Sequence, residues 1–234
     1  MYTIGKAFWL HAKARDLKFL NPVRNRLAKV LGGSCRGFEL GDPRSNAEAL
    51  IAVGNAASGF VVVLAHGGSD YIRGGEYMSR LTGEIVEVEK FVTRQDLGVF
   101  SGKVVFCLSC DSNQLAQAVV GSGAIAFVGF DEVPFDRFDA SGSPIGSHVL
   151  VKHCQALIAE AVQATLDRFI AGRASLEESV DYLRLWIAQK AVNYVRQMGR
   201  KGVKERKEVA ALFLKVKSGV KVHGVRGVWF KQNG

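Results

Sequence analysis

Two stretches of sequence decide the predicted fold: FVVVLAHGG at residues 60–68 and KVVFCLSCDSNQLAQAVVGSGAIAFVGF at residues 103–130. They contain three apolar runs of strand length, at residues 60–65, 104–108 and 124–130. A strand that is apolar at nearly every position is covered on both faces, as in a parallel sheet flanked by helices. These stretches therefore predict the centre of an α/β sheet.

The flanking segments extend the alternation of strands and helices. We expect further strands at residues 4–12 and 36–40, an edge strand or hairpin arm at 84–91, and a strand at 220–230 that can add to a sheet edge. Helices are predicted at residues 17–31, 46–53 (capped by Ser45 or Asn46), 93–100 (capped by Thr93), 112–120, 147–170, 176–196 and 204–217. This order predicts an α/β fold with three layers, in which helices cover both faces of a mostly parallel sheet.

Composition is typical of a globular protein, with 48% hydrophobic and 23% charged residues. We read no signal peptide at the start of the sequence, and no run reaches the roughly 20 apolar residues of a membrane span. The four cysteines are too few for a disulfide scaffold. These observations favour a cytoplasmic, reducing compartment without a membrane partner.

The net charge of +9 comes from the C-terminal end of the chain. Residues 196–234 hold 11 Lys or Arg and 2 Asp or Glu, whereas residues 1–195 hold 20 of each kind. We therefore divide the chain into a main domain at residues 1–198 and a basic C-terminal extension at 199–234, which packs on the domain or projects from it. The extension is either a solvated face or a surface for nucleic acid or an acidic partner.

The first and second apolar runs lead into His66 and Cys110. Sites in parallel sheets form beyond the carboxyl ends of the strands, so the pair has the placement of a thiol nucleophile and its base. A helix starting after Cys110 would lower the pKa of the thiol. The glycine after His66, Gly67, can donate its N–H to an oxyanion. Taken singly, such residues more often have a structural role, as a buried cysteine or a loop histidine, and it is their pairing after consecutive strands that favours a functional role.

These residues resemble the caspase-like cysteine peptidases, and most closely the bacterial CHAT-type domains. The resemblance lies in VVVLAHGG at 61–68, VVFCLSCDS at 104–112, LAQAVVGSG at 115–123 and AIAFVGF at 124–130, and in a helix–turn–helix pattern at 169–186. It spans roughly residues 1–195. The sequence departs from the family after the cysteine, where Asp-Ser replaces the usual small residues and glycine, and the caspase signature around the cysteine is absent.

The resemblance implies a caspase–hemoglobinase fold with His66 as the general base and Cys110 as the nucleophile. It assigns the oxyanion hole to the N–H groups of Gly67 and Cys110. No third catalytic residue, metal or cofactor is implied.

Three acidic residues, Asp111, Asp131 and Glu132, are expected near the rim of the predicted cleft. If they line the substrate pocket, the residue before the cut would be Lys or Arg, because opposite charges attract. The alternative is that Asp111 caps a helix and the other two are solvated loop residues.

The sequence thus predicts a cysteine endopeptidase that acts on a protein or peptide, as a regulated bacterial effector. A separate regulatory protein, or self-cleavage near Arg137 or at Arg200 and Lys201, would control it. The alternative is a catalytically inactive module of the same fold that binds protein or nucleic acid through the basic C-terminal segment.

Two further cysteine patterns are weaker. Cys107 and Cys110 form a single C-x-x-C pair, without the second pair that a zinc site needs. The sequence GSCRG around Cys35 fits a nucleophile elbow, but it precedes the HGG sequence, which is the wrong order for an α/β-hydrolase.

Overall fold

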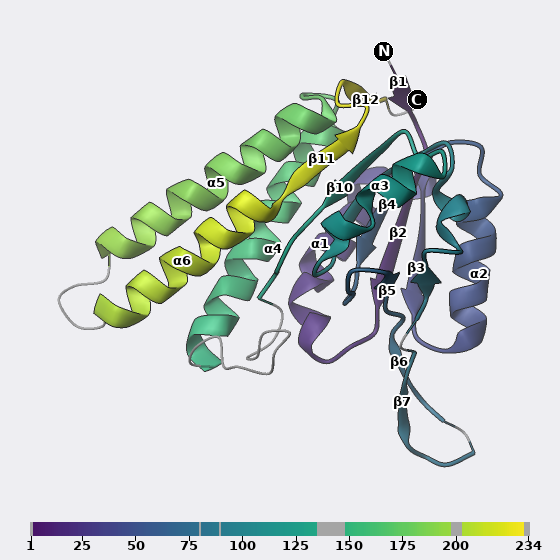
Figure 1. Ribbon diagram of the computed structural model, residues 1–234, viewed down its shortest axis with the longest axis horizontal. Helices are drawn as coiled ribbons and strands as arrows, with labels where there is room; N and C mark the ends of the chain where they lie inside the picture. The colour runs from purple at the N-terminus through teal and green to yellow at the C-terminus, as the bar shows by residue number, and fades with distance from the viewer. Residues whose placement is uncertain (1, 80, 89, 135–147, 198–202, 232–234) are drawn as a thin grey trace.

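The computed structural model describes residues 2–79, 81–88, 90–134, 148–197 and 203–231 (Figure 1). Its central sheet has six strands in the order β3–β2–β4–β9–β10–β11. They are β2 (Ala7–Ala12), β3 (Cys35–Leu40), β4 (Gly59–Leu64), β9 (Lys103–Leu108), β10 (Ala126–Gly129) and β11 (Lys221–Gly224). The first five strands of that order are parallel and β11 is antiparallel, which confirms the predicted α/β class with a mostly parallel sheet.

The two strands that precede His66 and Cys110 form the middle of this sheet. β4 (GFVVVL) and β9 (KVVFCL) are buried at every residue, as expected for strands with helices on both faces. They pair in parallel from Gly59 opposite Lys103 to Leu64 opposite Leu108. Their carboxyl ends therefore lie side by side.

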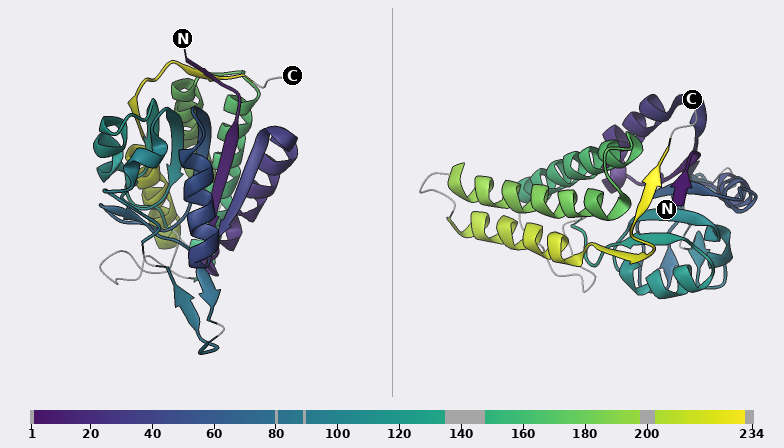
Figure 2. Two further views of the ribbon diagram at one scale, coloured as in Figure 1. Left: turned by 90° about the vertical axis from the view of Figure 1, so that its right-hand side faces the viewer. Right: turned by 90° about the horizontal axis from the view of Figure 1, so that it is seen from above.

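Helices cover both faces of the sheet (Figure 2). On one face, α1 (Asn21–Leu31) packs against α4 (His148–Ile170). On the other face, the short helix η3 (Leu97–Phe100) contacts both α2 (Pro43–Gly54) and α3 (Ala116–Gly121). α5 (Leu176–Gln197) packs on α4, and α6 (Val203–Gly219) packs on α5. A cluster of three rings, Phe60, Phe169 and Phe230, joins β4 to α4 and to the C-terminal end.

Several predicted helix starts are wrong in detail. The second helix is capped by Asp42, not by Ser45 or Asn46, because the Asp42 side chain accepts from the backbone N–H groups of Arg44 and Ser45. The predicted helix at 17–31 is a 3₁₀ helix, η1 (Asp16–Leu20), followed by α1. The first predicted strand divides into β1 (Tyr2–Ile4) and β2.

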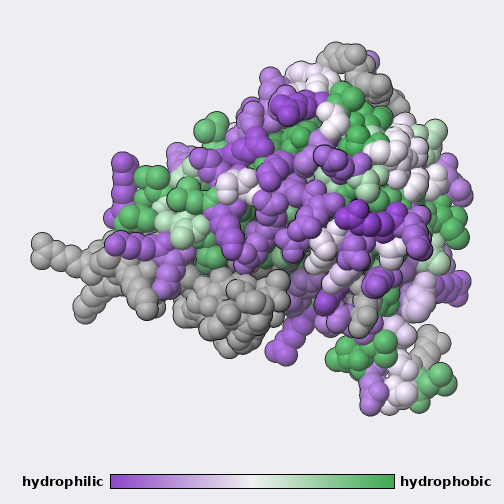
Figure 3. All heavy atoms as spheres, viewed as in Figure 1, coloured by the Kyte–Doolittle hydropathy of each residue, from purple (hydrophilic) through white to green (hydrophobic). Residues whose placement is uncertain are grey.

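The insert between β4 and β9 contains two small sheets. β5 (Tyr71–Ile72) pairs with β8 (Val92–Thr93), and β6 (Glu76–Met78) pairs with β7 (Ile85–Glu87). β7 confirms the hairpin arm predicted at 84–91. The helix predicted at 93–100 is only the 3₁₀ helix η3, which starts after Asp96, whose carboxylate accepts from the backbone N–H and the hydroxyl of Thr93. The hairpin projects from the domain, with exposed apolar residues towards its tip (Figures 1 and 3).

The basic C-terminal segment packs on the domain. β11 adds to the sheet beside β10, as predicted for residues 220–230, and β12 (Val228–Phe230) pairs in parallel with β1. The two ends of the described chain thus lie next to each other. Among the helices described, none combines the length and apolar composition that crossing a bilayer requires.

Candidate active site at the carboxyl edge of the sheet

His66 and Cys110 occupy equivalent positions after neighbouring strands. Leu64 and Leu108 are paired in the last register of β4 and β9, and each candidate residue comes two positions later. The pairing continues for one further step, because the backbone N–H of Ala65 donates to the carbonyl of Leu108. The structure therefore brings both residues to one edge of the sheet, as their positions in the sequence predict.

His66 is held by a carboxylate that the sequence analysis did not identify. Nε2 of His66 lies 2.8 Å from Oδ2 of Asp16, in the segment that follows β2. Burial acts to raise the pKa of Asp16, but the hydrogen bond and the charge of His66 outweigh burial and lower the pKa. A carboxylate at this distance fixes the orientation of the imidazole ring and can stabilise its protonated form.

Cys110 is in the protonated thiol form at neutral pH. Burial raises its pKa to about 11, the charges of Asp111 and Glu132 add to this rise, and the hydrogen bond to Val133 opposes it. Sγ of Cys110 donates to the carbonyl of Val133 at 3.3 Å. The expectation that a following helix lowers this pKa is wrong.

A regular α-helix does not follow Cys110 directly. In place of one helix at 112–120, the chain forms a 3₁₀ turn, η4 (Ser112–Gln114), and then the six-residue helix α3. The hydroxyl of Ser112 donates to the carbonyl of Ser109 at 2.8 Å and accepts from the N–H of Phe130 at 2.9 Å. These bonds hold the turn against β10 and delay the start of the helix.

Asp111 has the left-handed backbone conformation, with φ 55° and ψ 13°. It is the one non-glycine residue with positive φ in the described part of the chain. Its N–H donates to the carbonyl of Asp131, and its carbonyl accepts from Gln114. A sharp turn therefore follows Cys110 directly, and such conformations are common at functional sites.

Asp16, the partner of His66, and Val133, the partner of Cys110, come from opposite sides of the β4–β9 pair. Asp16 follows β2, which borders β4, and Val133 follows β10, which borders β9. The His66 imidazole and the Cys110 thiol thus each bond a group from the flanking strand on its own side.

The predicted oxyanion donors are the backbone N–H groups of Gly67, which follows His66, and of Cys110 itself. Among the described residues, no backbone carbonyl accepts from the N–H of either one. Gly67 is packed tightly, since a Cβ added to it would lie 2.2 Å from Oγ of Ser109 and 2.9 Å from the carbonyl oxygen of Tyr71. Only glycine fits this position without a shift of its neighbours.

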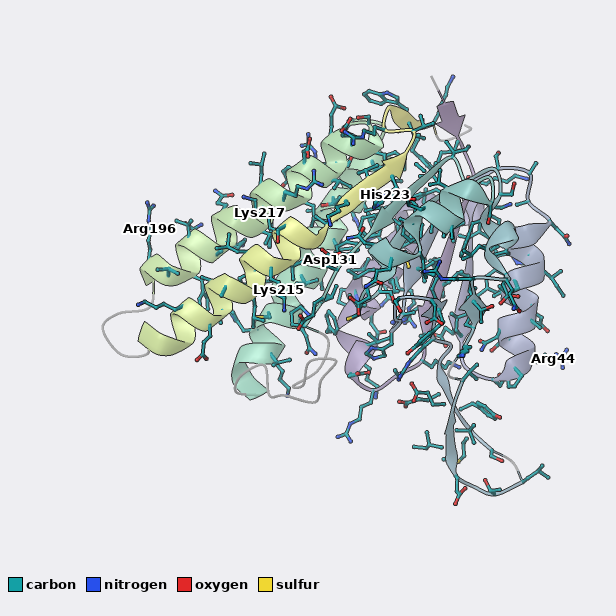
Figure 4. All side chains as sticks on the ribbon, viewed as in Figure 1. Arg44, Asp131, Arg196, Lys215, Lys217 and His223 are labelled. Carbon is teal, nitrogen blue, oxygen red and sulfur yellow. The ribbon has the colours of Figure 1, made fainter. Side chains whose placement is uncertain are left out.

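Two of the three predicted substrate-binding acids contact the chain's own C-terminal segment. Asp131 lies 3.4 Å from Nζ of Lys221, and Glu132 forms an ion pair with Lys215. Figure 4 labels Asp131 and Lys215 at this junction. Asn113 completes the junction: its Nδ2 donates to Asp131 at 2.7 Å, and its Oδ1 lies 3.1 Å from Nε2 of His223. The third acid, Asp111, is half-buried in the turn.

The remaining cysteines lie elsewhere. Cys107 is buried inside β9, and burial raises its pKa to about 12. Cys35 is the first residue of β3, at the amino edge of the sheet and thus opposite His66. All four cysteines are free thiols, and within the described ranges no three His, Cys, Asp or Glu side chains gather as a metal site would need.

Comparison with known proteins finds no family model that matches this chain and no curated protein sequence that is similar to it. The resemblance to caspase-like peptidases therefore rests on the sequence motifs and stays a prediction. The predicted self-cleavage sites, Arg137, Arg200 and Lys201, lie outside the described residues.

Proposed function

We propose that this protein is a cysteine endopeptidase of caspase-like fold, in which Cys110 is the nucleophile and His66 is the base. The observation that carries the proposal is that the two residues occupy equivalent positions. Leu64 of β4 pairs with Leu108 of β9, and His66 and Cys110 each follow two residues later. The contact between Nε2 of His66 and the Asp16 carboxylate supports it, because an oriented imidazole is what a thiol nucleophile needs.

In the proposed reaction, the sulfur of Cys110 attacks the carbonyl carbon of the scissile peptide bond while the thiol proton passes to His66. Since Nε2 of His66 is bonded to Asp16, Nδ1 is the nitrogen assigned this proton. The N–H groups of Gly67 and Cys110 donate to the oxyanion. The C–N bond then breaks, the imidazolium protonates the leaving amine, and water hydrolyses the thioester.

The described conformation is a resting form in this proposal. The thiol is protonated and donates to Val133, and the lysines Lys215 and Lys221 bind the acids beside it. Activation requires the thiol to leave the Val133 carbonyl and meet the imidazole, which would then accept the thiol proton. A separate regulatory protein that displaces the C-terminal segment is the trigger we propose.

Hydrolysis of a peptide library, read by mass spectrometry, tests this function. We expect Cys110→Ala to abolish cleavage and His66→Ala to slow it by about a hundredfold or more. The matched controls are Cys35→Ala and His153→Ala, which remove the same side chains away from the site and should leave cleavage unchanged. Cleavage that survives in Cys110→Ala would refute the assignment. If the three acids line the pocket, the products will end in Lys or Arg.

The raised pKa of Cys110 favours a second candidate, a catalytically inactive module of the same fold. In that case the basic C-terminal segment is the working surface, although Lys215 and Lys221 are engaged within the molecule. Binding to nucleic acid that weakens steeply with added salt, together with no peptide cleavage, would favour this candidate.

A further inference from the structure

A cavity of about 420 Å³ lies beyond the carboxyl end of β2, and neither Cys110 nor His66 is among its lining residues. Its wall includes the segment that follows β2, the first turns of α1 and the start of β6. The β6 side is fixed tightly, since the N–H of Glu76 donates to the carbonyl of Lys13 at 2.5 Å. A Cβ added to Gly75 would lie 1.9 Å from the carbonyl oxygen of Leu40. The cavity is therefore built into the fold and has the size of a small-molecule site.

Positive charge dominates this cavity. Four of its lining side chains are cationic: Lys13, Arg15, Lys18 and Arg24. The acid Glu39 pairs with Lys13 at 3.3 Å and also with Arg24, and the acid Glu76 lies in the wall. No ion pair engages Arg15 or Lys18 within the part of the chain that the structure describes. The cavity keeps a surplus of positive charge, which is suited to an anion.

A buried histidine adds a second polar feature. His11 lines the cavity with only 4% of its surface exposed, and its Nε2 has no hydrogen-bond partner among the described residues. Burial lowers the pKa of His11, and the charge of Arg24 lowers it further, so the ring is neutral at physiological pH. A neutral imidazole carries its proton on one nitrogen and accepts a hydrogen bond at the other. With the proton on Nδ1, the unpartnered Nε2 can accept from a hydroxyl group.

We propose that this cavity binds a small phosphorylated ligand that also carries a hydroxyl group, such as a sugar phosphate. The phosphate is bound by Arg15 and Lys18, with Arg24 and Lys13 behind them, and the hydroxyl donates to Nε2 of His11. A guanidinium group can donate two parallel hydrogen bonds to two oxygens of a phosphate. A phosphate also carries up to two negative charges, which suits a cavity lined by four cationic side chains better than the single charge of a carboxylate. Neither His66 nor Cys110 lines the cavity, although Arg15 directly precedes Asp16, the residue that contacts His66.

Calorimetric titration of the full chain tests the site with four probes: ribose 5-phosphate, inorganic phosphate, ribose and succinate. We expect ribose 5-phosphate to bind most tightly and ribose to give no signal. Arg15→Gln and Lys18→Gln should each weaken binding of ribose 5-phosphate about tenfold, since each removes a charged hydrogen bond. Both side chains are exposed at the rim, so these variants should fold normally.

The matched control is Lys29→Gln, which removes one exposed cation of α1 that does not line the cavity. It should bind ribose 5-phosphate as the unmodified chain does. His11→Phe should remove the advantage of ribose 5-phosphate over inorganic phosphate while both still bind, with circular dichroism confirming the fold.

Three results would overturn the proposal. The first is no binding of either phosphate at about 10 mM, a concentration that reveals even millimolar affinity. The second is equal weakening in Lys29→Gln and Lys18→Gln, which would indicate general charge attraction. The third is tighter binding of succinate than of ribose 5-phosphate, which would point to a carboxylate ligand. Because all readouts are binding, they do not depend on peptidase activity.

Discussion

Asp111 links the chemistry of Cys110 to the shape of its turn. Its backbone is left-handed, a conformation that asparagine and glycine tolerate as well as aspartate, and its charge acts to raise the pKa of the neighbouring thiol. The side chain and the backbone of this residue can therefore be tested separately.

Replacing Asp111 by Asn should lower the pKa of Cys110 from its value of about 11, because the left-handed turn is kept and the negative charge is removed. In the unmodified chain, alkylation of Cys110 by iodoacetamide should become about tenfold faster per pH unit as pH rises towards the pKa, since the thiolate is the reactive form. The Asn variant should react faster at neutral pH, as read by mass spectrometry of the Cys110 peptide. Asp70→Asn, an exposed loop control, should match the unmodified chain. Equal rates in both variants would contradict the electrostatic account.

Gly67 should not tolerate a methyl group. Gly67→Ala would place Cβ against Oγ of Ser109 and the carbonyl of Tyr71, and we expect a loss of about 1–3 kcal/mol of unfolding free energy in urea. Adding Ser109→Ala should recover part of the loss, since Ser109 Oγ is buried without a hydrogen-bond partner among the described residues. Gly33→Ala, with nothing within 4 Å of the new Cβ, is the control. No difference between the two glycine variants would refute this packing.

At the scale of elements, the turn after Cys110 is fastened to the C-terminal segment. Asn113 donates to Asp131 and to the carbonyl of Gly219 at the end of α6, and it meets His223 on β11. One side chain thus joins the site, the last helix and the edge strand. A partner that moved α6 or β11 would act directly on the turn that holds the thiol.

Asn113→Ala should loosen this junction. The loss of its hydrogen bonds should cost about 1–3 kcal/mol of unfolding free energy and speed hydrogen exchange at the amides of β11. The exposed neighbour Gln114 provides the control, because Gln114→Ala removes a side chain of similar chemistry outside the junction. If both variants have the same urea midpoint and the same β11 exchange, the junction does not hold the segment.

At the scale of the whole molecule, the strand order decides which residues meet. Apolar runs and turn residues predict the parallel strands and the edge that holds His66 and Cys110, because these signals are local. Asp16 was missed because nothing near it in sequence shows that β2 lies beside β4. The predicted lowering of the Cys110 pKa is wrong for a related reason: burial raises this pKa most and the charge of Glu132 adds to the rise, and both act on the thiol only in the folded chain. Likewise, the sequence places Lys215 and Lys221 in a basic segment, but it does not show that Glu132 and Asp131 are their partners in the folded chain.

Labelling by a peptidyl acyloxymethyl ketone, with each cysteine quantified by mass spectrometry, tests the central claim most directly. It should be performed on the full chain and on the Lys215→Gln/Lys221→Gln variant, in which the C-terminal segment is less firmly held. The account predicts that Cys110 is modified in preference to Cys35, faster in the lysine variant, and about a hundredfold or more slower after His66→Ala. Equal modification of the cysteines, or labelling of Cys110 that does not change when His66 is removed, would contradict it.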